Sequence, residues 1–145
     1  MKKRTALLLA LLMFLGISIG TAFAQTDSGT GITVYLNDQE LILEDLPVIE
    51  QGRTLVPMRG FFEALGAEVA WIASTRTAIG TRGDITVIIP IGSNQPLVNG
   101  TEVTIEVPAR IINNRTYIPL RFVGEALGEQ VEWDGIHRAV LITTQ

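Results

Sequence analysis

Apolar and polar residues alternate with a period of two in several short segments of the chain. The alternation runs through residues 32–36, 85–91 and 103–107 and predicts half-buried strands. Asn37-Asp38 and Asn99-Gly100 are turn-forming pairs of the kind found in tight hairpins. Because the connections are short, most strand pairs are expected to be antiparallel.

After Pro57 and Pro119 the apolar period changes to that of a helix. Proline fits the first turn of a helix, and Gly66 and Gly128 stand where a helix end favours a left-handed residue. A helix of about nine residues is too short to be stable alone, so each must pack on a sheet. The expected buried stripe contains Met58, Phe61, Phe62 and Leu65, then Leu120, Val123 and Leu127.

The same phrase occurs twice at an offset of 62 residues: RTLVPMRGFFEALG at 53–66 and RTYIPLRFVGEALG at 115–128. Further matches flank it, so we predict an internal duplication with repeats at about 32–91 and 94–143. The predicted fold class is α+β, with two β-β-β-α-β-β repeats. Their mostly antiparallel, curved sheets are each expected to pack around one short helix.

The two predicted helices differ in where their bulky ring lies. The first has Gly60 and Phe62, and the second has Phe122 and Gly124. The ring therefore moves by two helical positions, roughly 200° around the axis. This predicts that the two helices face different neighbours.

The N-terminus reads as a signal peptide over residues 1–24. Three basic residues precede an apolar stretch over 6–19, and Ala22-Phe23-Ala24 follows, which predicts cleavage between Ala24 and Gln25. An uncleaved membrane anchor is the alternative. Residues 25–31 are predicted to form a flexible leader before a domain over 32–145. The protein is expected to be secreted or associated with the cell surface or wall, with no stable membrane insertion after signal removal.

Charge and cysteine content narrow the partners. There are no cysteines, so stability must come from a hydrophobic core rather than disulfides. Without the signal, eight arginines face fifteen acidic residues and no lysine remains. Nucleic acid and anionic polymers are therefore disfavoured, whereas a neutral glycan is compatible.

Candidate catalytic groups are few. His137 is the single histidine and is expected in an exposed turn. Glu63 and Glu125 could act as paired carboxylates, but they lie four residues after Arg59 and Arg121, a spacing that favours ion pairs on a helix face. We predict no catalytic, cofactor-binding or metal-ligating residues.

Three further features have both a structural and a functional interpretation. Arg59 and Arg121 stand near helix N-termini, where a positive charge is disfavoured, so each needs a compensating partner or binds an anionic ligand. Trp71 and Trp133 are expected to face the core, with sugar stacking as the alternative. Arg82-Gly83-Asp84 matches an integrin-binding tripeptide, but is ordinary turn chemistry.

The segments GRTLVPMR and EALGAEVAW, with their second copy ending in EALGEQVEW, resemble the copper amine oxidase N-terminal-like domain, or stalk domain, of exported Gram-positive proteins. The resemblance implies an antiparallel sheet around a helix, outside any catalytic domain. Amine oxidases of this class need three copper-binding histidines and a quinone-forming tyrosine in an Asn-Tyr-Asp/Glu setting. This chain has only His137, and Tyr35 and Tyr117 lack that setting.

We therefore predict a non-catalytic, exported binding or assembly module, with no enzymatic activity. Its partner is expected to be another exported protein or a second copy of itself, possibly a neutral glycan. A module that binds carbohydrate or cell-wall glycan is the first alternative and predicts that Trp71 or Trp133 is exposed. A small acid-base hydrolase is the second and predicts convergent carboxylates in a deep pocket.

Overall fold

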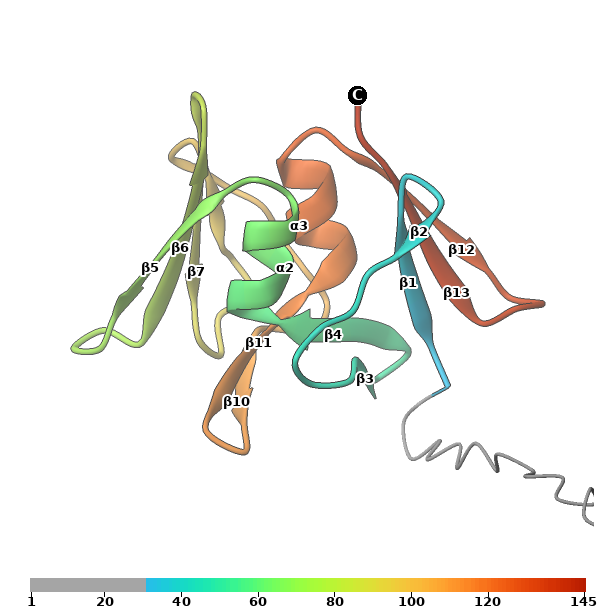
Figure 1. The fold of residues 1–145 in the computed structure, drawn as a ribbon. Helices are drawn as coiled ribbons and strands as arrows, with labels where there is room; N and C mark the ends of the chain where they lie inside the picture. The colour runs from blue at the N-terminus through green and yellow to red at the C-terminus, as the bar shows by residue number, and fades with distance from the viewer. Residues whose placement is uncertain (1–30) are drawn as a thin grey trace, which may run out of the picture.

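A computed structural model describes residues 31–145. The predicted signal peptide, its cleavage site at Ala24 and Gln25, and leader residues 25–30 lie outside these described residues. The described chain is α+β: it forms three sheets and two short helices. In Figure 1 the helices stand between a sheet on the left and a sheet on the right, with the third sheet below them.

The strands are arranged as follows. Sheet A has the order β12 (Gln130–Asp134), β13 (Ala139–Thr143), β1 (Thr33–Leu36), β2 (Gln39–Glu40). Sheet B has the order β10 (Arg110–Ile112), β11 (Arg115–Pro119), β4 (Arg53–Pro57), β3 (Val48–Glu50). Sheet C has the order β5 (Glu68–Ile72), β6 (Thr77–Arg82), β7 (Ile85–Pro90), β8 (Leu97–Val98), β9 (Thr101–Glu102). The helices are α2 (Met58–Ala64) and α3 (Leu120–Ala126).

The sheets are shared between the two halves of the chain, which differs from the predicted arrangement of separate sheets. The hairpin β1–β2 joins the late strands β12 and β13, whereas β8–β9 joins the early strands β5 to β7. After each hairpin an extended segment of seven residues, 41–47 or 103–109, can span roughly 23 Å and so reach the other side of the molecule. As predicted, the pairing is mostly antiparallel; β1 with β13 is parallel.

The strand predicted over 103–107 is wrong as a strand, although its alternation is real. Val103 and Ile105 donate backbone hydrogen bonds to the carbonyls of Pro96 and Asn94 at 2.9 Å, so the segment pairs with a loop rather than a sheet. Val107 is buried, whereas the intervening residues 104 and 106 are exposed. A period of two records which face is buried but not which backbone groups bond across it.

The helices follow the predicted pattern. Their apolar stripes are buried, and Gly66 and Gly128 adopt the positive φ values of 76° and 90° that close each helix. The helices also have different neighbours, since both contact β4 and β11 but α3 additionally packs against β7. The relocated ring has a matching space: a methyl group on Gly80 would lie 2.1 Å from the ring of Phe62.

One arginine joins the C-terminal ends of both helices. Arg82 donates from Nη1 to the carbonyl of Leu65 at 2.8 Å and from Nη2 to the carbonyl of Leu127. Its Nη2 also lies 3.3 Å from Glu129, whose side chain is only 2% exposed. A positive charge at a helix C-terminus is favourable, so a single guanidinium stabilises two helix ends. Because Arg82 faces inward, Arg82-Gly83-Asp84 is not presented as a tripeptide.

A second, smaller cluster of buried residues contains Leu55, Val107 and Tyr117. The hydroxyl of Tyr117 donates to the carbonyl of Leu46 at 3.2 Å. Burial raises the pKa of this phenol, and the negative charge of Asp45 raises it further. The folded state therefore binds the phenolic proton more tightly than the unfolded state does.

Ionisation of Tyr117 should consequently weaken the fold in alkaline solution. The stabilisation is complete below about pH 10, the ordinary pKa of tyrosine, and is lost as the pH rises through the higher folded pKa. Urea unfolding between about pH 8 and pH 11 should show this loss in the native chain, whereas Tyr117→Phe should lack it. Tyr35→Phe is the matched control, and identical pH profiles for Tyr117→Phe and native protein would contradict the linkage.

Candidate functional site: a groove beside Trp133

A groove of about 620 Å³ lies between the start of α3, the inner face of β12 and the extended segment 103–107. The turn between β3 and β4 forms its remaining wall. Aromatic and aliphatic side chains share its lining with two arginines and two glutamates. The residues used below are Arg53, Glu106, Arg121, Phe122, Glu125 and Trp133.

Trp133 is 47% exposed, so the prediction that both tryptophans belong to the core is wrong for this one. Trp71 occupies the position 62 residues earlier and is partly buried against the main core. Both lie on strands in the same phase as a valine two residues before them. Strand phase alone therefore does not decide their burial.

The difference between the two halves follows from the residue on the helix. In the first half, a methyl group placed on Gly60 would be 3.3 Å from Leu43, so the crossing segment lies close to α2. Sixty-two residues later the helix carries Phe122, and Phe122 and Ile105 both line the groove. The ring of Phe122 occupies space that Gly60 leaves to the segment, which keeps the groove beside Trp133 open.

Arg121 has the compensating partners that its place near a helix N-terminus requires. Its Nη1 donates to the carbonyl of Val131 at 2.9 Å and lies 3.3 Å from Glu125. The predicted ion pair at i, i+4 is therefore present in α3. The predicted pair of Arg59 with Glu63 is not: both side chains are exposed, and none of the ion pairs within residues 31–145 involves Arg59.

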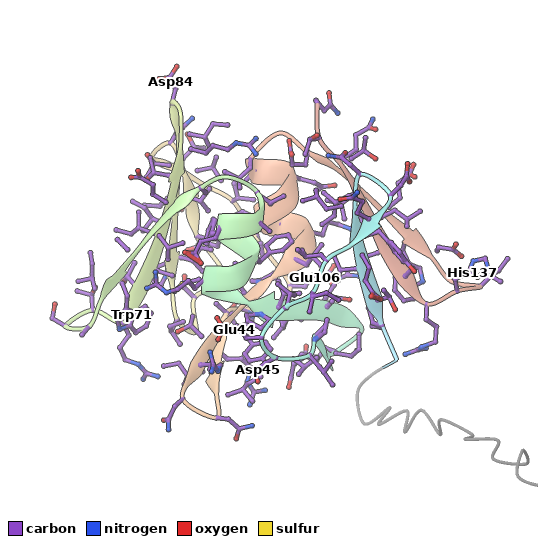
Figure 2. All side chains as sticks on the ribbon, in the orientation of Figure 1. Glu44, Asp45, Trp71, Asp84, Glu106 and His137 are labelled. Atoms are coloured by element: carbon purple, nitrogen blue, oxygen red, sulfur yellow. The ribbon has the colours of Figure 1, made fainter. Side chains whose placement is uncertain are left out.

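Arginines and glutamates retained at the 62-residue offset form reciprocal ion pairs between the halves. Arg53 meets Glu106 at 2.7 Å, and Arg115 meets Glu44 at 2.7 Å. Glu44, with help from the neighbouring Asp45, raises the pKa of Arg115 above its usual range. Figure 2 places Glu44, Asp45 and Glu106 together in the middle of the molecule, above sheet B. The repeated Arg and Glu positions therefore have a structural role in joining the halves.

His137 lies at the tip of the hairpin between β12 and β13, as Figure 2 shows, in the exposed turn that was predicted. Its Nδ1 lies 2.8 Å from Asp134, and hydrogen bonds from His137 lower the pKa of that carboxyl. Ile136 beside it is 89% exposed. Over residues 31–145, no three histidine or carboxylate side chains gather as they would around a metal ion.

Sequence reasoning missed the groove and the bridging role of Arg82. The signal for the groove was available in the exchange of Gly60 for Phe122, but its effect depends on a segment that crosses from the other sheet. Nothing in the local sequence pairs Arg82 with the ends of two helices. Within the described part of the chain, no helix is both long and apolar enough to cross a bilayer.

The comparisons with known proteins agree on the kind of domain. The sequence profile of the family described as "Copper amine oxidase N-terminal domain" matches residues 35–142. A protein of Brevibacillus choshinensis named "Protease inhibitor" is 30% identical over 125 residues, which cover 85% of this chain and 37% of that protein. The chain thus spans little more than a third of that relative's length. It belongs to the copper amine oxidase N-terminal domain family, a non-catalytic stalk-type domain.

Proposed function

We propose that the protein is an exported binding module that holds a ligand at or outside the cell surface, in the groove beside Trp133. The observation that carries the proposal is the half-exposed Trp133 on the inner face of β12, next to a groove of about 620 Å³. Binding sites are typically concave and mostly apolar, with a few well-placed polar groups. The groove has these features.

We also propose that the two halves are copies of one unit. The bounds of β3, β4, α2 and β5 recur 62 residues later as those of β10, β11, α3 and β12. On this account the first copy keeps the scaffold with a close crossing segment at Gly60, and the second has gained a groove through Phe122. Export through the predicted signal over residues 1–24 belongs to the same proposal.

A hydrolase is less well supported by the same groove. Glu106 and Glu125 both line it, as paired catalytic carboxylates would. However, each is bonded to a guanidinium, from Arg53 and Arg121. A general acid instead stands against an apolar wall that keeps it protonated. The two ion pairs therefore favour binding over hydrolysis.

Inhibition of an extracellular protease is a second candidate, and the named relative favours it. Because the chain matches only 37% of that protein, the inhibitory part could lie elsewhere in the relative. Residual activity of serine, cysteine and metalloproteases during titration with the chain tests this candidate. A stoichiometric loss of activity for one class is the expected result if the chain inhibits.

The groove proposal is tested by localisation. The full chain is secreted from a Gram-positive host, and its distribution between medium and washed cell walls is measured by immunoblot. Trp133→Ala should shift the chain from the walls to the medium by about tenfold, a change of about 1.4 kcal/mol in binding. The exposed aromatic side chain would supply this binding energy.

Ile136→Ala is the matched control, since Ile136 is an exposed residue on the same hairpin, and it should distribute like the native chain. Circular dichroism and thermal unfolding establish that each variant is folded. A folded Trp133→Ala variant that stays on the walls as the native chain does would refute the groove as the site.

A further inference from the structure

We infer that the ligand of the groove is a neutral oligosaccharide strand, with Trp133 as the platform on which a sugar ring packs. This inference rests on the proposed function and names its ligand class. It draws on four features of the groove: the placing of the indole, the paired polar side chains at the rim, the balance of charge, and the blocked edge of β12.

The indole of Trp133 is held by the hairpin that carries it. Its strand is paired with β13, where Trp133 stands opposite Val140, and a methyl group on Gly135 would lie 3.3 Å from the indole Nε1. The ring is thus packed on one edge while nearly half of the residue stays open to solvent. A positioned, flat apolar face suits the C–H face of a pyranose ring, because little conformational freedom is lost on binding.

The polar side chains of the groove are held in ion pairs, which fix their planar groups. Arg53 and Glu106 are joined at 2.7 Å, and Arg121 and Glu125 at 3.3 Å. A guanidinium has five N–H donors and a carboxylate about four acceptor sites, so each pair keeps unused donors and acceptors. Neighbouring hydroxyl groups of a sugar both donate and accept, and therefore match such pairs.

The charges of the groove argue for a neutral ligand. Two arginines face two glutamates, which gives the groove no formal excess of either sign. The surrounding protein is acidic overall, so an anionic polymer would be repelled at longer range. A neutral strand meets neither penalty.

An extended peptide fits less well because the nearest strand edge is already occupied. β12 is the outer strand of sheet A, and an added peptide strand would need its outward-facing backbone groups. The carbonyl of Val131, next to the groove, already accepts the hydrogen bond from Arg121 at 2.9 Å. Strand addition beside Trp133 would have to break this bond and displace a charged group from its partners.

The inference is tested with three neutral probes: cellotetraose, maltotetraose and N-acetylated chitotetraose. Binding to the purified secreted chain is measured by isothermal calorimetry. At least one probe should bind, and both Trp133→Ala and Trp133→Leu should weaken that binding by about tenfold. Trp133→Leu keeps apolar bulk but lacks a flat ring, so it separates loss of the platform from loss of folding. Ile136→Ala should bind as the native chain does.

Salt dependence distinguishes the ligand classes. Binding of a neutral strand should be unchanged between about 50 mM and 500 mM NaCl, because no ionic attraction is screened. Three results would overturn the inference: no binding of any probe by the folded chain, equal binding by the Trp133 variants, or binding only to a polyanion with a steep loss in salt. If wall binding persists but disappears after protease treatment of the walls, the ligand is a protein; the inference then fails while the proposed function stands.

Discussion

Replacement of Phe62 by alanine is expected to lower the free energy of unfolding by about 3–5 kcal/mol, the range for removing a fully buried phenylalanine. Phe62 is completely buried in the main core. Its ring lies against Gly80, where an added methyl group would be 2.1 Å from a ring carbon. The ring and the missing side chain at Gly80 therefore form one packing unit.

This unit predicts strong coupling in a double-mutant cycle followed by urea unfolding. Gly80→Ala alone should cost about 1–3 kcal/mol, because the buried ring cannot move away freely. In the Phe62→Ala background the same methyl group should be tolerated or stabilising, since it enters the cavity left by the ring. The second half of the chain carries the opposite choice at the equivalent positions, with Gly124 on the helix and Ile142 on the strand. Additive effects of the two substitutions would show that the positions do not share one space.

Loss of Arg82 is expected to be the most costly change to a charged residue. Arg82→Met removes donors from the carbonyls of Leu65 and Leu127 and leaves Glu129 buried without its ion-pair partner. Breaking a buried ion pair in this way costs about 3–5 kcal/mol. Since Arg82 itself is partly exposed, we expect the lower end of that range, near 3 kcal/mol.

The cause of this loss can be separated by second substitutions. Glu129→Gln in the Arg82→Met background should recover part of the stability, because it removes the unpaired buried charge. Arg82→Lys should fall between native protein and Arg82→Met, since an ammonium group cannot reach three acceptors with the geometry of a guanidinium. Urea unfolding of the four proteins measures these differences. A loss below about 1 kcal/mol for Arg82→Met, or no recovery with Glu129→Gln, would contradict the bridging role.

Local features of the fold could be predicted from the sequence because they depend on neighbouring residues. The left-handed Gly66 and Gly128 end the helices, and the Asn37-Asp38 and Asn99-Gly100 pairs form the hairpin turns with positive φ. The buried helix stripes follow directly from a period of 3.6 residues. Each of these rests on contacts within about eight residues.

The arrangement of the sheets could not be predicted in the same way. The hairpins β1–β2 and β8–β9 have similar sequences and could pair within their own half or across to the other. The observed exchange depends on where the extended segments 41–47 and 103–109 lead, and their local pattern is that of a strand. The reciprocal pairs of Arg53 with Glu106 and Arg115 with Glu44 reflect this exchange and were invisible as pairs in the sequence.

The candidate site was partly predictable. Trp133 was identified as a residue that could stack on a sugar, and Arg121 as one in need of a partner. Their actual setting depends on Phe122, which lies opposite a segment from across the fold. The exposure of Trp133 and the burial of Trp71 are therefore tertiary effects of one substitution between the halves, from Gly60 to Phe122.

The most direct test of a binding groove beside Trp133 uses the two tryptophans as internal probes. The chain has two tryptophans, so a nitrogen-proton NMR spectrum of the labelled protein contains two indole signals, which Trp133→Phe assigns. On addition of solubilised cell-wall glycan, the indole signal of Trp133 should shift in a saturable way while that of Trp71 stays in place. A shift of Trp71 alone, or no shift of either signal under conditions where the chain binds intact walls, would contradict the account.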